Sequence, residues 1–195
     1  MILVINGHPS RKSFTGAVAE SYAEGVREGG GRVEIVHLAD LTFDPILHEG
    51  YRKVMPLEPD LVRAQELIRA CTRLVICYPH WWGTGPAILK GFIDRTFLPG
   101  FAFKYRDKSA FWDKLLSGRS AEIWLLSDSP RFWFVLKYWN SPIKWLKTAT
   151  LDFCGFKPVK VNIVDRVRFL SEDLRKKVLI RASKAGKLAA AKSPV

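Results

Sequence analysis

Residues 74–97 read LVICYPHWWGTGPAILKGFIDRTF. The first five residues are continuously apolar, as in a strand that is buried on both faces of a sheet. From Pro86 onward the apolar residues recur at helical spacing, and a proline in the first helical turn loses no hydrogen bond. The stretch therefore predicts a buried strand, a loop and a helix. It also places Trp81 and Trp82 in a loop, where polar residues are usual.

The same alternation of strand and helix repeats along the whole chain. Apolar runs predict strands at 2–6, 32–38, 74–78, 122–126 and 159–164. Helical spacing predicts helices at 14–29, 60–72, 86–97, within 134–153 and at 171–190. Five strands that are each followed by a helix predict an α/β fold, a three-layer sandwich in which helices cover both faces of a parallel sheet.

The composition of the strands predicts their order in that sheet. The runs at 2–6, 74–78 and 122–126 are continuously apolar, whereas 32–38 and 159–164 alternate. Because alternation suits an edge strand and a continuous run suits an inner one, the expected order is 2-1-3-4-5. This is the flavodoxin-like arrangement.

Length and composition are those of one soluble domain. The 195 residues are 48% hydrophobic and 26% charged, and no linker or repeat divides them, so one domain is expected over 1–195. No apolar run is long enough to span a membrane and the N-terminus lacks the features of a signal peptide, so a cytoplasmic location is expected. Cys71, Cys77 and Cys154 have apolar neighbours and indicate reduced core thiols. The alanine-rich tail, 184–195, is expected to be a fraying helix end.

The net charge of +12 raises the question of a polyanionic partner. A basic surface also suits small anionic ligands or simply solvation. The basic residues are spread along the chain, and neither a zinc-ligand pattern nor an RNP-like motif is present. Nucleic acid is therefore not the expected partner.

In such a sheet, ligands bind beyond the carboxyl ends of the strands, where the strand order reverses. Here that point lies between the first and third strands. The loop after the first strand, NGHPSRKSFTG (6–16), opens a helix, and free N–H groups at a helix N-terminus suit a phosphate. The alternative is a serine or threonine N-cap with incidental charges. The polar residues of this loop are His8, Ser10, Arg11, Lys12, Ser13 and Thr15.

The loop after the third strand holds Trp81 and Trp82, which suit a flat aromatic ligand, while Gly83 and Gly85 allow backbone to approach it. Alternatively, the two indoles cover the end of the sheet or join an oligomer interface. In the next loop, residues 127–129 either touch a ligand or form a plain turn. A phosphate site beside a ring site matches flavin mononucleotide, and a flavin supplies its own redox chemistry. No metal site is expected.

Three motifs resemble the flavodoxin-like NAD(P)H:quinone oxidoreductases, the group of DT-diaphorase and of the ancillary oxidoreductases of potassium-efflux systems. They are GHPSRKSFT (7–15), PHWWGTGPAILKGFIDRTFLPGFAFKY (79–105) and LDFCGFKPV (151–159). The resemblance covers most of the chain. It implies that His8, Lys12, Ser13, Phe14 and Thr15 surround a flavin phosphate. It also implies that the flavin ring is lined by Pro79, His80, Trp81, Trp82, Gly83 and Thr84. The position of the loop after the fourth strand, and not the resemblance, adds Ser127 and Asp128 as candidate cofactor-binding residues.

The resemblance further implies hydride transfer from NADH or NADPH to the flavin, then reduction of a quinone or similar acceptor by a ping-pong mechanism, in a homodimer. The chain departs from the longer members at 126–129, Leu-Ser-Asp-Ser instead of Thr-Thr-Gly-Gly, and it lacks their C-terminal extension. The missing extension favours FMN over FAD. The family's proton-transferring Tyr and His have no clear counterpart; Tyr138 is a weak candidate.

Two other functions are compatible with such a chain. One is a regulatory flavoprotein subunit of a membrane transporter of the potassium-efflux type, and the other is a flavodoxin-type electron carrier, against which the basic charge argues. Residues 131–147, RFWFVLKYWNSPIKWLK, combine aromatic and basic side chains, as at a membrane surface. Because Pro142 interrupts a helix there, and the aromatics suit a flavin or dimer contact equally well, membrane contact is not expected.

Overall fold

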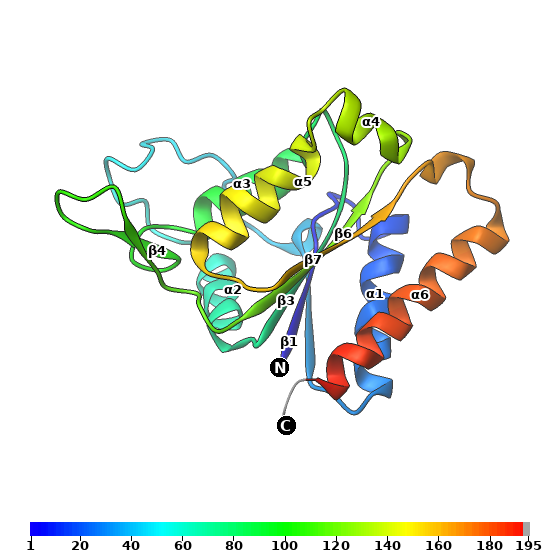
Figure 1. The fold of residues 1–195 in the computed structure, drawn as a ribbon. Coiled ribbons are helices and arrows are strands. Elements are labelled where there is room, and N and C mark those ends of the chain that lie inside the picture. Colours follow the sequence, from blue (N-terminus) through cyan, green and yellow to red (C-terminus); the bar gives the residue numbers. More distant parts are fainter. Residues whose placement is uncertain (193–195) are drawn as a thin grey trace.

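A parallel sheet of five strands crosses the centre of the molecule (Figure 1). The computed structural model describes residues 1–192. The strands of the sheet are β1 (Ile2–Asn6), β2 (Val33–His37), β3 (Arg73–Pro79), β6 (Ser120–Leu126) and β7 (Val159–Val164). They lie in the order β2-β1-β3-β6-β7. The predicted α/β fold with a parallel sheet is confirmed.

The numbering of this order differs from the predicted 2-1-3-4-5 because two short strands precede the fourth strand of the sheet. β4 (Phe103–Tyr105) and β5 (Trp112–Lys114) form a separate antiparallel pair that the sequence analysis did not predict. Three-residue strands are too short to show a periodic pattern. Within the main sheet, β1 is buried throughout and the alternating strands β2 and β7 lie at the edges, as their composition predicts.

Helices cover both faces of the sheet (Figure 1). One face carries α1 (Phe14–Glu28) and α6 (Glu172–Ala191), and the other carries α2 (Pro59–Ala70), α3 (Ala87–Thr96) and α5 (Ser141–Leu146). Each face has its own apolar core, one built around Val18, Tyr22 and Trp124, the other around Ile76 and Phe92.

Helices α1 and α6 pack with their backbones in close approach. A Cβ added at Gly25 would lie 1.9 Å from the Ser183 carbonyl oxygen, and one at Gly186 would lie 2.1 Å from that of Tyr22. Only glycine fits at these two crossings. The closing helix runs to Ala191, and the last part of the tail that was expected to fray, 193–195, lies outside the described residues.

The helical stretch predicted within 134–153 is confirmed over α5 and the helical turn that follows it, but a break and a separate short helix precede it. The structure has α4 (Arg131–Leu136), then α5, then a π-helical turn (Lys147–Asp152). Trp139 and Asn140 separate α4 from α5 with φ values of 48° and 60°. Such left-handed residues cannot continue a right-handed helix. Short 3₁₀ turns follow β2 (Leu38–Asp40) and β7 (Val167–Phe169).

This topology brings three loops to one edge of the sheet. The chain leaves β1 toward β2 on one side and continues from β3 toward β6 and β7 on the other, so the order reverses between β1 and β3. The loops after β1 (7–13), β3 (80–86) and β6 (127–130) therefore meet where such folds bind ligands.

Candidate functional site

A cavity of about 760 Å³ opens where these loops meet. Eleven of the thirteen predicted residues line it: His8, Ser13, Phe14, Thr15, Pro79, His80, Trp81, Trp82, Gly83, Ser127 and Asp128. Lys12 and Thr84 do not line it. Lys12 is exposed just before the helix, and Thr84 closes the turn that carries the tryptophans. The cavity is within the size range of small-molecule sites.

Five further residues line it: Leu126, Ser129, Tyr138, Ser141 and Val167. Sequence reasoning names Ser129 as an alternative ligand contact and Tyr138 as a weak candidate for proton transfer, and it does not place the other three at the site. Leu126 and Ser129 flank the predicted pair in the loop after β6. Val167 follows β7, so the rule that places sites at carboxyl ends of strands would have found it if applied to the last strand. Tyr138 and Ser141 flank Trp139 and Asn140, the two left-handed residues in the segment where a helical stretch was predicted.

The N-terminus of α1 forms one wall of the cavity. Ser13 is the N-cap, and its Oγ accepts a hydrogen bond from the Gly16 N–H at 3.0 Å. The first N–H groups of a helix have no partner within it, so this wall presents donors to an anion. Gly16 is required here, because an added Cβ would lie 2.2 Å from the Arg11 carbonyl oxygen.

The two cations beside this helix differ in their surroundings. The Arg11 guanidinium lies 3.1 Å from Asp40 and 3.5 Å from Glu20, so it is neutralised by carboxylates. Lys12 is exposed at the residue before the N-cap. Lys12 is therefore the cation that an anion at the helix N-terminus would meet.

His8 joins the first loop to the tryptophan turn. Its Nδ1 lies 2.9 Å from the Ser10 nitrogen and 3.0 Å from the Ser10 oxygen, and its backbone N–H donates to Asn6 Oδ1 at 3.2 Å. The ring meets Trp81 edge-on, with centroids 5.6 Å apart. Partial burial lowers the pKa of His8, against a smaller opposing effect of its bond to Ser10, so the ring favours the neutral form.

The tryptophans stand on a tight turn over residues 81–84. Trp81 N–H donates to the Thr84 carbonyl at 3.2 Å, and Thr84 N–H donates to that of Trp81 at 3.0 Å. The central residues, Trp82 and Gly83, have φ values of 50° and 80°, as in a type I′ turn. Glycine and asparagine adopt this conformation readily, whereas a tryptophan does not.

Trp82 is also fully exposed, so its indole contributes nothing to the core. Because Trp82 lines the cavity, its exposed indole is accessible from the cavity.

His80 connects the loops after β3 and β6. Its Nε2 accepts the Gly83 N–H at 3.1 Å, so its proton lies on Nδ1, which donates to Ser127 Oγ at 3.1 Å. Partial burial lowers the pKa of His80, which favours this neutral form. The rings of Phe134 and Tyr138 pack edge-on against the imidazole, at centroid distances of 5.2 and 5.3 Å.

The loop after β6 presents a hydroxyl to the cavity and uses its carboxylate elsewhere. Ser127 Oγ accepts from His80 and from the Ser129 N–H at 3.0 Å, so its own proton remains available to a ligand. Asp128 accepts the Arg168 N–H at 2.8 Å. Although Asp128 lines the cavity, its carboxylate also holds the loop after β7.

Within residues 1–192, no group of His, Cys, Asp and Glu side chains is arranged to hold a metal ion. None of the helices described there has the length and apolar character of a transmembrane span. The three cysteines are free and buried, as predicted, and burial raises the pKa of Cys71 to about 11 and that of Cys154 to about 12. Such thiols are inert at neutral pH.

Curated proteins similar to this chain include quinone dehydrogenases. "NAD(P)H dehydrogenase (quinone) 1" of Cavia porcellus is 27% identical over 202 residues, which cover 91% of this chain and 72% of that protein. "Ribosyldihydronicotinamide dehydrogenase (quinone)" of Mus musculus is 26% identical over 204 residues, which cover 91% of this chain and 87% of that protein.

Solved structures agree with this similarity. An NAD(P)H:quinone oxidoreductase from Methanothermobacter marburgensis is 26% identical and superposes with a TM-score of 0.79, over 95% of this chain and 96% of that one. An FMN-dependent NADH-azoreductase from Bacillus anthracis, solved with FMN, shares the fold at 20% identity and a TM-score of 0.71, over 98% of each chain. The family model described as "Flavodoxin-like fold" matches residues 1–185. The protein therefore belongs to the flavodoxin-like fold family.

Proposed function

We propose that the protein is a flavin-dependent oxidoreductase that takes hydride from NADPH or NADH and reduces quinones or similar small-molecule acceptors. One observation carries the proposal: a single cavity has the donor-rich N-terminus of α1 on one side and the exposed Trp82 turn on another. The names of the quinone dehydrogenases with which the chain aligns over about nine-tenths of its length support the same reaction.

The residues present fit a flavin mononucleotide. Ser13, Thr15 and the first N–H groups of α1 would hold its phosphate, with Lys12 and His8 as nearby donors. Trp81 and Trp82 would pack against its ring. That contact would bury the Trp82 indole, which is otherwise exposed on a residue with a left-handed backbone conformation. FMN is the form we favour, and FAD is the alternative.

The chemistry that a flavin would supply in this cavity is the acceptance and return of hydride, which would let nicotinamide and acceptor react in turn by a ping-pong mechanism. The chain's own residues bind and orient. His80 fixes the turn through Gly83 and fixes Ser127, and because both of its ring nitrogens are engaged it is a positioning residue rather than a proton donor. Ser127, whose hydroxyl proton is not used within the loop, would donate it to a polar edge of the bound ring. Tyr138 contributes a phenol to the cavity wall and is our candidate proton donor.

The named relatives are enzymes, which favours this function over a regulatory transporter subunit and over an electron carrier. The net charge of +12 attracts phosphate-bearing donors without selecting NADPH over NADH. On the family resemblance, we propose a homodimer in the cytoplasm.

Steady-state kinetics test the function. FMN-loaded protein is given NADPH and a water-soluble benzoquinone at several fixed concentrations of each. We expect quinone reduction with parallel double-reciprocal lines, the mark of a ping-pong mechanism. Flavin-loaded protein that oxidises NADPH no faster than free FMN would refute an enzymatic role.

A further inference from the structure

A series of hydrogen bonds leads from the edge of the sheet to the first loop of the cavity. Asn6 and His37 are the last residues of β1 and β2, and the strand register sets them opposite each other. Both are buried, with 0% of Asn6 and 5% of His37 exposed, and the Asn6 Nδ2 lies 3.1 Å from the His37 Nδ1. Because amide and imidazole groups are costly to bury, this pair depends on its hydrogen-bond partners.

Those partners fix the direction of each hydrogen bond. The Asn6 Oδ1 accepts the His8 backbone N–H at 3.2 Å, so the Asn6 NH₂ group is the one that faces His37. The His37 Nδ1 therefore accepts, and the ring proton lies on Nε2, which is 3.0 Å from a carboxylate oxygen of Glu20 in α1. Each group donates to the next, and the series ends on a carboxylate. We call Asn6, His37 and Glu20 the edge network.

The same carboxylate also holds the first loop from outside. The Glu20 oxygen that faces His37 lies 3.5 Å from the Arg11 guanidinium. Arg11 also lies 3.1 Å from Asp40, in the 3₁₀ turn that follows β2. The first loop is therefore attached at two points, by the backbone of His8 and by the side chain of Arg11, and both attachments lead to Glu20.

The edge network reaches the cavity through this loop. Its three residues do not line the cavity, whereas His8 and Ser13 of the loop do. Asn6 also lies beneath the first turn of α1, since a Cβ added at Gly16 would be 3.2 Å from its Nδ2. The wall that presents N–H donors to an anion thus rests on the edge network.

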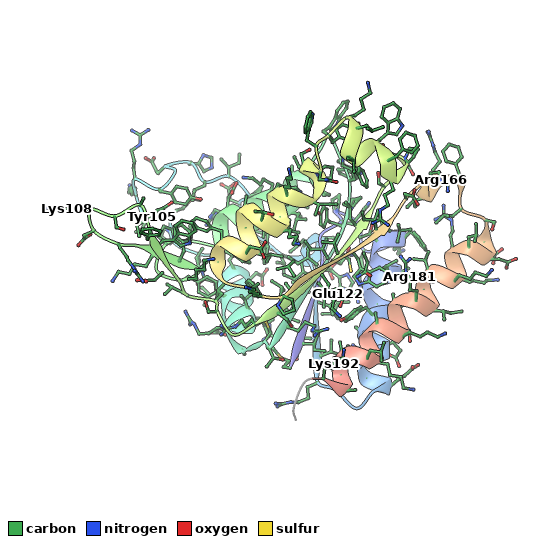
Figure 2. All side chains as sticks on the ribbon, in the orientation of Figure 1. Tyr105, Lys108, Glu122, Arg166, Arg181 and Lys192 are labelled. Carbon is green, nitrogen blue, oxygen red and sulfur yellow. The ribbon has the colours of Figure 1, made fainter. Side chains whose placement is uncertain are left out.

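A second buried polar cluster, in the middle of the sheet, has its partners within the core instead. Glu122, which Figure 2 labels there, accepts hydrogen bonds from the side chains of Tyr22, Trp124 and Asn162. These four residues belong to α1, β6 and β7, and they do not line the cavity. The edge network differs because it ends on the backbone of a cavity residue.

We infer that His37 is a positioning residue for the anion site, which through Asn6 holds the first loop in the conformation that binds the flavin phosphate. The inference rests on the proposed function for the identity of the anion. A loop that is fixed before binding loses less conformational freedom when the phosphate binds, so its affinity for the phosphate is higher. Because riboflavin lacks the phosphate, its affinity should not depend on His37.

The first test uses the wild-type protein without flavin. A long-range ¹H–¹⁵N correlation spectrum at pH 7.5 reports which ring nitrogen of each histidine carries the proton. We expect His37 to be protonated on Nε2 alone. A proton on Nδ1 would overturn the inference, because the Asn6 amide would then have to turn its oxygen to His37 and its NH₂ group to the His8 N–H.

Two substitutions of His37 separate positioning from a merely structural role. His37→Leu removes both ring hydrogen bonds and should weaken FMN binding about fivefold, measured by quenching of flavin fluorescence, without changing riboflavin binding. His37→Gln, whose amide can accept from Asn6 and donate to Glu20, should restore much of the FMN affinity. His48→Leu is the control, because His48 is exposed and bonded to Asp44, and it should bind both flavins as the wild type does.

A second pair of variants lies on the surface of α1. Glu20→Ala releases both attachments of the loop and should weaken FMN binding about threefold. Simple charge predicts the opposite, since loss of a carboxylate near an anion site should strengthen the binding of an anion. Glu24→Ala removes a neighbouring carboxylate of α1, paired with Arg27 at 3.0 Å, and should not weaken FMN binding.

The outcomes distinguish this inference from the proposed function. A wild-type protein that binds neither flavin would refute both. Flavin binding by the wild type that His37→Leu leaves intact, or weakens equally for FMN and riboflavin, would overturn the inference alone. So would tighter FMN binding by Glu20→Ala.

Discussion

The Nδ1 of His80 lies 3.1 Å from the Oγ of Ser127, and this hydrogen bond joins the ends of the neighbouring strands β3 and β6. Through its other nitrogen the same imidazole accepts the Gly83 N–H. One neutral ring thus fixes the tryptophan turn and a hydroxyl of the cavity wall relative to each other.

This arrangement makes stability depend on pH. Burial lowers the pKa of His80 below its ordinary value of 6.5, so the unfolded chain binds protons more readily than the folded one. The contribution of His80 to stability is complete above pH 6.5 and is lost as the pH falls through the lowered pKa. We expect a melting temperature that falls from pH 7.5 to pH 5.5. The fall should be smaller in His80→Gln, whose amide both donates and accepts hydrogen bonds but does not titrate. Equal pH dependence in the two proteins would contradict this role.

Trp82→Asn should stabilise the fold while weakening flavin binding. Asn-Gly is the preferred pair for a type I′ turn, so relief of the left-handed tryptophan should add about 1 kcal/mol, or about 2–4 °C in melting temperature. Loss of the indole should weaken FMN binding about tenfold, measured by quenching of flavin fluorescence. Trp139→Asn is the control: Trp139 is also left-handed and exposed but does not line the cavity. It should raise the melting temperature without changing FMN affinity.

Lys12→Gln should discriminate between flavins. If Lys12 faces a phosphate at the N-terminus of α1, its loss should weaken FMN binding about tenfold and leave riboflavin binding unchanged. Lys177→Gln, an exposed lysine on α6, serves as the matched charge control. A parallel loss for FMN and riboflavin would mean that Lys12 does not act on the phosphate.

Glu58→Gln should destabilise the protein, although Glu58 does not line the cavity. The Arg95 side chain is fully buried, and its guanidinium lies 2.8 Å from the Glu58 carboxylate. Without that carboxylate the buried charge is uncompensated, which should reduce the free energy of unfolding by about 2–3 kcal/mol in a urea titration. The adjacent Asp94→Asn breaks an exposed pair with Lys90 and should reduce it by less than about 0.5 kcal/mol. Similar losses would show that Arg95 does not depend on Glu58.

The sequence predicts the sheet and most of the cavity wall for identifiable reasons. The apolar runs at 2–6 and 74–78 predict inner strands. In a parallel sheet, the loops that follow these strands lie at the same edge of the sheet. His8, Ser13, Trp81 and their neighbours therefore could be placed around one cavity without a structure.

What the sequence could not predict depends on contacts between distant residues. The pairing of His80 with Ser127 joins positions 47 apart, and no local pattern encodes it. The left-handed conformations of Trp82 and Trp139 contradict local propensity, so a propensity argument fails at both. The second of these separates α4 from α5, a break that falls inside the segment where a helical stretch was predicted.

The most direct measurement is the visible spectrum of the FMN-loaded protein, freed of unbound flavin and mixed with NADPH under anaerobic conditions without any acceptor. We expect the flavin absorbance to bleach fully with about one equivalent of NADPH and to return when a benzoquinone is added. A protein that retains no flavin, or whose bound flavin stays oxidised in excess NADPH and NADH, would contradict this expectation.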